Sequence, residues 1–468
     1  MLFRSSREAT SVTAAQCSNC ATDALAPARC QHWPVGVSRH EESGAEWARR
    51  DAAVVWHGFT PMDEYLAGEP LMVDRAEGHE LVDVDGRRYL DAISSLWVNT
   101  LGHHVPELDQ AIREQLDRVA HSTLLGHGNR VVVELAEALA AVVPVDDARF
   151  LFAGDGASAV EQALKIAFQY WVNVGRPERS GFLAFGGAYH GDTVGALSLG
   201  DAGLGAAVFD PLRFPVLRAP SFDDDPEFKA AVEIVHDRAD DLAAVVVEPP
   251  VQGAAGMRMA PAPSFARLAA ACRETGVLLV YDEVATGFGR TGTLFAADQC
   301  GGPDAWPNLR PDILCLGKGL TAGYLAMSAT VVAGRVADAF GARGRHLAHG
   351  HSFGGNALAA AVAVRHLGLL DERRVLDNVA ARSGQLRGLL AERIRPLDGV
   401  VDIRLCGLMG GVDVDGGPDR GRQVCAAATR AGVLLRPLGE TVVLMPPLTV
   451  TEAEVERIVD VLAGALHG

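Results

Sequence analysis

The chain has 468 residues, of which 49% are hydrophobic and 22% are charged, as in an ordinary globular protein. Its formal net charge of −17 argues against binding to nucleic acid or to an anionic membrane surface, because both require a basic face. No apolar run approaches the length of a membrane span, and the start lacks an apolar signal-peptide region, so we expect a cytoplasmic protein.

Residues 1–45 lack a periodic apolar pattern and are predicted to form a disordered extension. The alternative is that the sequence starts at a codon upstream of the natural start codon. Residues 1–45 contain Cys17, Cys20, Cys30 and His32, a set of side chains that can bind a metal ion. Nothing apolar surrounds this cluster to build a zinc-binding fold, so we expect no metal site. A non-catalytic scaffold that uses this extension is the alternative outside the enzymes.

The rest of the chain is predicted to form two domains. Residues 46–94 begin a small domain, with two strands around the turn Asp85-Gly86, a strong hairpin signal. Residues 95–370 alternate buried strands with helices, one of which should start with a capping box of Ser158 and Glu161 and end at Gly175. This alternation predicts a large α/β domain with a mostly parallel sheet. Residues 371–468 predict a smaller α+β lobe, which the early hairpin should join.

Three segments follow predicted strands directly, which is where ligands bind in open α/β sheets. The turn Gly154-Asp155-Gly156 precedes a helix and can form an anion cradle, or a tight connection only. Asp282 ends a buried strand and needs a cationic partner, for which a protonated ring nitrogen is suitable. Lys318 follows another buried strand, where burial favours the neutral, nucleophilic amine, unless it reaches water or pairs with an acid.

These three parts together satisfy the requirements of pyridoxal 5′-phosphate, which needs a phosphate cradle, a carboxylate at the ring nitrogen and a lysine for the aldehyde. Tyr189 can supply an aromatic lid over the ring. Residues 287–292 match G-x-G-x-x-G, a pattern that dinucleotide-binding sites share. Those glycines neither follow a strand directly nor begin a helix, so we expect no such site there.

Four segments resemble the class III aminotransferases of fold type I: AYHGDTVGA (188–196), VVVEPPVQGAAGM (245–257), VYDEVATGFGRTG (280–292) and DILCLGKGLTAG (312–323). The resemblance runs from about Trp47 to the C-terminus. It implies a pyridoxal-phosphate-binding large domain with a mostly parallel seven-stranded sheet, a smaller α+β domain, and a homodimer with active sites shared between subunits.

The resemblance also implies roles for residues. Lys318 is the Schiff-base lysine and proton carrier, and Asp282 pairs with the pyridine nitrogen. Gly156 and Ala157 contact the phosphate, and Tyr189 stacks on the cofactor and lines the substrate pocket. Further cofactor or substrate contacts are implied for Phe59, Leu96, Gly350, His351, Ser352 and Arg436. Of these, 350–352 match a loop that reaches the neighbouring subunit, and Arg436 matches an arginine that binds a substrate carboxylate.

Longer segments, such as HGHSFGGNALA (349–359) and GVLLRPLGETVVLMPPL (432–448), resemble one branch of this family. That branch aminates 8-amino-7-oxononanoate in biotin synthesis, with S-adenosyl-L-methionine as the amino donor. Many members of the family have a tyrosine where this chain has Phe59, and a pair of tryptophans where it has Leu96 and Trp97. In these departures the chain resembles the members that use L-lysine as amino donor. Lysine as donor, and another ω-amino acid or diamine transaminase, therefore stay open as alternatives.

Four other polar residues attract attention. Glu248 follows a buried strand and is expected to orient the pocket or to contact the ligand directly. Arg290 lies near the predicted site, and we expect a structural role for it. His103 and His104 lie in a predicted loop and do not require a metal.

Overall fold

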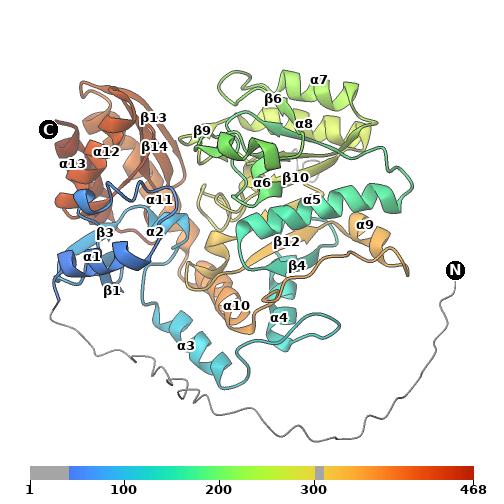
Figure 1. The fold of residues 1–468 in the computed structure, drawn as a ribbon, viewed down its shortest axis with the longest axis horizontal. Helices are drawn as coiled ribbons and strands as arrows, with labels where there is room; N and C mark the ends of the chain where they lie inside the picture. The colour runs from blue at the N-terminus through green and yellow to red at the C-terminus, as the bar shows by residue number, and fades with distance from the viewer. Residues whose placement is uncertain (1–41, 301–309, 468) are drawn as a thin grey trace, which may run out of the picture.

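The computed structural model describes residues 42–300 and 310–467. It contains a large domain and a smaller domain in which the first elements of the chain lie beside the last ones (Figure 1). The cluster of Cys17, Cys20, Cys30 and His32 lies outside the described residues. Within the described ranges, no His, Cys, Asp and Glu side chains are grouped to hold a metal ion, and no helix is long and apolar enough to cross a membrane.

The large domain is built on a seven-stranded sheet with the strand order β4-β12-β11-β10-β7-β5-β6. Only β12 runs antiparallel to its neighbours, so the predicted α/β fold with a mostly parallel sheet is confirmed. The strands are β4 (Arg149–Ala153), β5 (Gly181–Phe185), β6 (Leu217–Ala219), β7 (Leu242–Val247), β10 (Leu278–Asp282), β11 (Ile313–Leu316) and β12 (Ser328–Val332).

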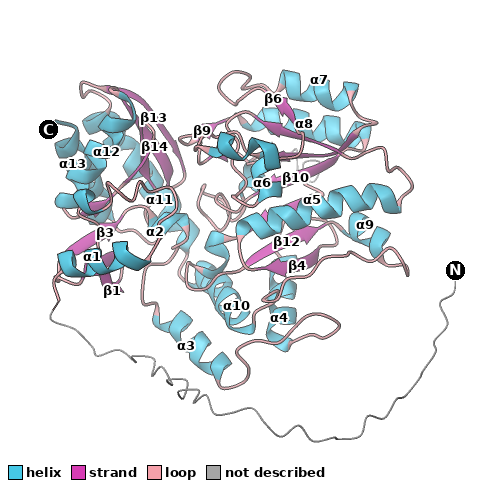
Figure 2. Cartoon of the chain, viewed as in Figure 1, coloured by secondary structure: helices cyan, strands magenta, loops and turns pink. Residues whose placement is uncertain are grey.

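Helices cover both faces of this sheet (Figure 2). Successive residues of β10 point to opposite faces, so Val280 packs in the cluster under α5 while Tyr281 packs in the cluster that contains Phe265 of α8. Burial on both faces explains why the strands read as continuous apolar runs. The helices of this domain are α3 (Pro106–Leu116), α4 (Arg130–Ala140), α5 (Gly156–Asn173), α6 (Val194–Leu199), α7 (Lys229–Asp237), α8 (Ala262–Thr275), α9 (Gly334–Ala337) and α10 (Ala357–Glu372).

The small domain combines both ends of the chain. The predicted hairpin is confirmed, because β2 and β3 pair antiparallel across Asp85-Gly86, and β15 then pairs parallel with β3. A second sheet has the order β13-β14-β17-β16. The elements are α1 (Gly44–Val54), β1 (Val73–Glu77), β2 (Glu80–Asp83), β3 (Arg88–Asp91), α2 (Ser94–Trp97), α11 (Val375–Leu389), β13 (Val400–Cys406), β14 (Met409–Val414), α12 (Gly417–Arg430), β15 (Val433–Leu434), β16 (Arg436–Leu438), β17 (Thr441–Leu444) and α13 (Glu452–His467).

Two helix starts differ from the prediction. Helix α1 begins at Gly44, so residues 44 and 45 are helical rather than part of a disordered extension. The predicted capping box is wrong, because Asp155 caps α5 and its carboxylate accepts the N–H (2.8 Å) and hydroxyl (2.9 Å) of Ser158. A carboxylate is favoured there by the helix dipole. Glu161 instead accepts the N–H of Gly195. The predicted domain boundary at 370 falls inside α10.

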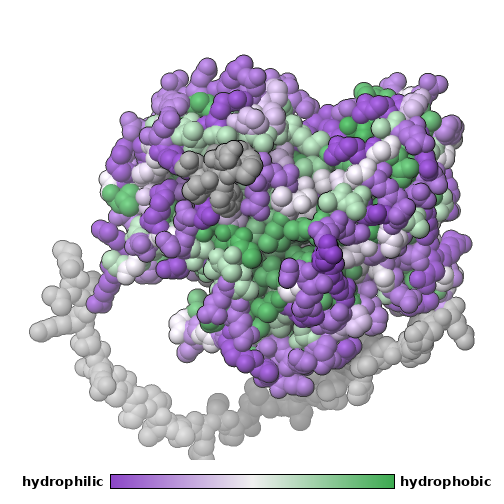
Figure 3. Space-filling model, turned by 180° about the vertical axis from the view of Figure 1, so that it is seen from behind, coloured by the Kyte–Doolittle hydropathy of each residue, from purple (hydrophilic) through white to green (hydrophobic). Residues whose placement is uncertain are grey.

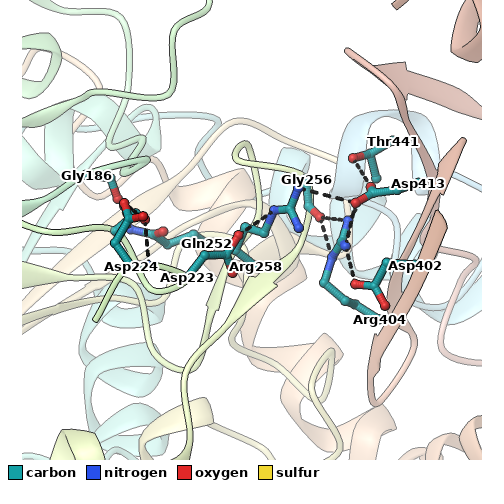
Figure 4. A network of polar contacts seen from close by, with 11 residues as sticks. Gly186, Asp223, Asp224, Gln252, Gly256, Arg258, Asp402, Arg404, Asp413 and Thr441 are labelled. Carbon is teal, nitrogen blue, oxygen red and sulfur yellow. Dashed lines mark hydrogen bonds and ion pairs between the residues drawn. The ribbon is translucent and has the colours of Figure 1, made fainter. Parts of the chain in front are cut away.

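A buried polar network joins the small domain to the hairpin of β8 (Val251–Gln252) and β9 (Arg258–Met259) in the large domain (Figure 4). Arg404 of β13 donates to Asp413 (2.7 Å) and to the carbonyl oxygen of Gly256 (2.8 Å). Arg258 lies 3.3 Å from Asp413, and the hydroxyl of Thr441 donates to the same carboxylate. Charged hydrogen bonds of this kind hold one wall of the candidate site against the small domain.

Candidate active site

A cavity of about 510 Å³ lies at the ends of several strands of the large sheet. Five residues predicted from the sequence line it together: Gly156, Ala157, Tyr189, Asp282 and Lys318. They come from the connections after β4, β5, β10 and β11, with Asp282 the last residue of its strand. The strand ends therefore gather these side chains as expected for an α/β sheet.

Lys318 begins a short 3₁₀ turn with a φ of 40°, a strained conformation for a residue with a side chain. Its Nζ lies 5.1 Å from the ring centroid of Trp97, and in the described part of the chain it makes no hydrogen bond or ion pair. Burial lowers the pKa of Lys318, and the carboxylates of Asp282 and Glu248 offset this only in part. The amine is thus unpaired and more easily deprotonated, as a nucleophile or proton carrier must be.

Asp282 is held by a histidine that the sequence analysis missed. Nδ1 of the buried His190 lies 2.7 Å from Oδ2 of Asp282, and Oδ1 accepts the N–H of Val284 at 3.0 Å. His190 Nε2 has no partner among the described residues. The signal was available, since His190 directly follows the predicted lid Tyr189 in the loop after a strand. His190 orients the carboxylate toward the cavity and limits its rotation.

The start of α5 lies in the cavity wall. Gly156 and Ala157 are its first two residues, and within the described ranges their N–H groups have no acceptor. A Cβ on Gly156 would lie 2.5 Å from Cγ1 of Val284, so a side chain there would collide with the cavity wall. Free N–H groups at a helix start, next to small residues, bind anions such as phosphate.

Tyr189 and Glu248 form the next part of the wall. Glu248 accepts the backbone N–H of Tyr189 at 3.0 Å and that of Gly253 at 3.3 Å, so it orients the loop that carries the tyrosine. Burial raises the pKa of Glu248 to about 7. Burial, together with the hydrogen bond from its hydroxyl to Asp192 (2.8 Å), holds the pKa of Tyr189 well above its ordinary value. Tyr189 is therefore a neutral phenol at physiological pH.

The other predicted site residues lie outside this cavity. Phe59 is 67% exposed and lines a neighbouring cavity of about 610 Å³, which shares Tyr189. Nε2 of His351 lies 3.3 Å from the N–H of Gly154, beside the cradle of its own chain. The carbonyl oxygen of Ser352 accepts a hydrogen bond from His121. Five of the predicted residues line neither cavity: Leu96, Gly350, His351, Ser352 and Arg436.

The backbone explains why Leu96 lies outside. Residues 94–97 form one left-handed turn, with φ values of 50°, 47°, 74° and 69°. A left-handed conformation costs a residue with a side chain about 1–2 kcal/mol. The turn leaves Leu96 48% exposed and places Trp97 in the cavity wall at 7% exposure, its Nε1 without a partner among the described residues. Trp97 is thus the pocket residue of this pair, and the sequence analysis did not select it.

Arg290 is buried, and its guanidinium donates to the carbonyl oxygens of Leu408 and Pro446 and to Ser94 and Asn99. Burial lowers the pKa of Arg290 to about 9, and the negative charge of Asp91 offsets this shift only in part. These contacts tie the left-handed turn to the C-terminal segment. They support the structural role that was expected for Arg290.

The groups of the cavity fit pyridoxal phosphate. The cradle of Gly156 and Ala157 matches a phosphate, the unpaired amine of Lys318 matches an aldehyde, and Asp282 matches a protonated ring nitrogen. The free Nε2 of His190 and Nε1 of Trp97 are buried polar atoms that lack partners within the described part. A site with several unsatisfied polar groups is prepared for a polar ligand.

This fold and this site define a pyridoxal-phosphate-dependent transaminase, and the chain belongs to the class III aminotransferases, whose family description matches residues 65–466. It is 43% identical to the adenosylmethionine-8-amino-7-oxononanoate aminotransferase of Nitratidesulfovibrio vulgaris over 444 residues, which cover 89% of this chain and 80% of that protein. The protein of the same name from Geobacter sulfurreducens is 37% identical, with 90% and 97% of the two chains covered.

Solved structures agree with this assignment. The crystal structure of adenosylmethionine-8-amino-7-oxononanoate aminotransferase from Methanocaldococcus jannaschii has a TM-score of 0.86 at 35% identity, and covers 91% of this chain and 99% of that chain. An omega transaminase from Pseudomonas jessenii has a TM-score of 0.83 at 27% identity, with 90% and 98% covered. The fold is therefore shared across transaminases whose names differ.

Proposed function

We propose that the chain transfers an amino group from S-adenosyl-L-methionine to 8-amino-7-oxononanoate, giving 7,8-diaminononanoate in biotin synthesis. The observation that carries this proposal is the name shared by relatives that are 43% and 37% identical over most of both chains. Those names specify adenosylmethionine, which favours this donor over lysine. The omega transaminase is 27% identical and supports the reaction class alone.

Bound in this cavity, pyridoxal phosphate would supply an aldehyde that reacts with amines and a pyridinium ring that accepts electrons from a breaking C–H bond. Gly156 and Ala157 would bind the phosphate through their N–H groups. Asp282 would keep a proton on the ring nitrogen, and His190 would hold that carboxylate in place. Tyr189 would cover the ring and exclude water.

Lys318 would bind the aldehyde carbon between turnovers and be displaced by the donor amine. Its lowered pKa allows the free amine to take a proton from the substrate carbon and to return it. The amino group would reach the acceptor ketone in a second half-reaction in which Lys318 moves the proton in the opposite direction. The expected kinetics are therefore ping-pong.

We assign acceptor specificity to residues outside the cavity that holds Lys318. Arg436 on β16 is half-buried, and within the described ranges its guanidinium has no hydrogen bond or ion pair, so it is available for a carboxylate. Phe59 and Leu96 would supply apolar contacts for the substrate chain. The loop of Gly350, His351 and Ser352 would contact phosphate and substrate across a subunit boundary.

The two half-reactions test this substrate pair. Adenosylmethionine alone should bleach the visible absorbance of the holoenzyme, lysine alone should not, and 8-amino-7-oxononanoate should restore the colour. Arg436→Ala should raise the KM of the acceptor about tenfold, the size of a lost charged hydrogen bond, with the donor step unchanged. Bleaching by lysine would make lysine the amino donor. Bleaching by β-alanine, with no response to 8-amino-7-oxononanoate, would indicate another ω-amino acid transaminase.

The proposal includes a cytoplasmic homodimer. Figure 3 shows a continuous hydrophobic area on the face opposite to that of Figure 1. Leu125 and Phe353 are large apolar side chains that are 69% and 61% exposed. Phe353 directly follows Ser352 and contacts the ring of His121. A second copy of the chain that covers Leu125 and Phe353 would also complete the site with residues 350–352.

Sedimentation equilibrium of the holoenzyme should therefore give twice the chain mass of 49.4 kDa. Phe353→Glu should lower the dimer fraction and weaken cofactor retention together, because burying a new charge at the interface is unfavourable. A fully active monomer would contradict the shared site.

A further inference from the structure

We propose that Asp91 and His103 are positioning residues, which hold the left-handed turn 94–97 so that Trp97 faces Lys318. The inference deepens the proposed function and rests on it for the statement that this cavity is catalytic. It concerns a contact system behind the cavity wall, in which neither residue lines the cavity that holds Lys318.

Asp91 ends β3, and its side chain is fully buried. Its carboxylate accepts two hydrogen bonds from Ser95, one from the N–H (2.9 Å) and one from the hydroxyl (2.7 Å). Both bonds go to a residue inside the turn, where φ is 47°. A right-handed backbone would redirect the N–H of Ser95, so the pair of bonds is tied to the left-handed conformation.

His103 supplies a third hydrogen bond to the carboxylate of Asp91. The amide oxygen of Asn99 accepts the N–H of Gly102 at 2.7 Å, which turns its NH₂ group toward His103 Nδ1 at 3.1 Å. Nδ1 is therefore an acceptor, and Nε2 carries the hydrogen that it donates to Asp91 at 3.0 Å. The imidazole satisfies both neighbours, and it binds the same carboxylate oxygen, Oδ2 of Asp91, as the hydroxyl of Ser95.

The first residue of the turn is anchored independently. The hydroxyl of Ser94 donates to the carbonyl oxygen of Met445 at 2.6 Å and accepts from Arg290. Asp91 therefore controls the middle of a turn whose start is already fixed. The last residue, Trp97, packs closely against Gly253, where an added Cβ would lie 3.0 Å from the indole ring, so this contact leaves no room for a side chain at position 253.

The consequence reaches the lysine. Trp97 lies over Lys318 Nζ at 5.1 Å and forms part of the wall that separates the amine from water. Relaxation of the turn toward ordinary φ values would withdraw the indole and let water reach the amine. The expected effect is a slower proton transfer with little change in substrate affinity, so kcat falls more than KM rises.

The test compares Asp91→Asn with Asp83→Asn. Asp83 is also buried and accepts two backbone N–H groups, of Asp85 and Arg87, and a hydroxyl, of Tyr89, but it ends strand β2. Hydrogen exchange of residues 93–100 in the holoenzyme should accelerate about tenfold in Asp91→Asn, as for a lost charged hydrogen bond. Asp83→Asn should leave that segment unchanged. Equal exchange in the two variants would overturn the proposal.

A double-mutant cycle separates positioning from general destabilisation. Asp91→Asn should lower kcat about tenfold in the wild-type background, and less than about twofold when Trp97→Ala is already present, because the effect passes through the indole. Additive losses would overturn the proposal. The visible circular dichroism of the bound cofactor should change in Asp91→Asn without any substrate, so this result stands even if a different amine proves to be the substrate.

Should Asp91→Asn not fold, Ser95→Ala tests the same contact at an exposed residue. It removes the hydroxyl bond alone, and exchange of residues 93–100 should rise about threefold, as for one neutral hydrogen bond. Unchanged exchange and unchanged kcat in Ser95→Ala would then refute the role of Asp91.

Discussion

Replacing Lys318 by alanine is expected to abolish transamination, with kcat reduced by about 10⁴-fold or more, since no other lysine is among the described residues that line the cavity. The fold should persist, because Lys318 makes no hydrogen bond or ion pair within the described structure and its burial is unfavourable for the charged form. Steady-state rates and thermal unfolding followed by circular dichroism measure the two effects separately.

The chain offers a matched control for this variant. Lys229 is exposed and forms an ion pair with Glu227 at the start of α7, away from the cavity. Lys229→Ala should keep full activity, and a small primary amine added to Lys318→Ala should restore part of the proton transfer. Turnover of Lys318→Ala at the wild-type rate would refute the assigned role of this lysine.

Asp282→Asn is expected to lower kcat by about 10²–10³-fold, the size found when one electrostatic contact to developing charge is removed. A neutral amide cannot stabilise a proton on the ring nitrogen, and its NH₂ group would oppose the donor N–H of His190. The cofactor should still bind, because the cradle of Gly156 and Ala157 is unchanged. Absorbance titration of the apoprotein would measure that affinity beside the rate.

Asp312→Asn is the control for this prediction. Asp312 is also a largely buried aspartate of the large sheet, and it pairs with Arg335. It precedes the first residue of β11, whereas Asp282 is the last residue of β10. Replacement of Asp312 should lower stability and leave kcat within about twofold, since it lies far from the reacting groups. Equal loss of kcat in Asp282→Asn and Asp312→Asn would show that the effect is structural.

The sequence by itself determined the α/β class, the early hairpin and the residues that end the strands. Continuous apolar runs bounded by Gly317 or Asp282 are local signals, and they identify buried strands without knowledge of their neighbours. Parallel strands place their carboxyl ends at one edge of a sheet, so the order of elements was enough to predict that Lys318, Asp282 and Gly156 meet.

Only the tertiary structure decided the details of the site wall. Asp155 and Ser158 are near each other in the sequence, and only the structure shows that Asp155 is the residue that caps α5. The left-handed turn that places Trp97 inside and Leu96 outside depends on distant residues: Asp91, Arg290 and Met445. Pairing of His190 with Asp282 likewise joins residues from different strand ends. Such contacts offset local strain through groups that are distant in the sequence, so local propensity contains no signal for them.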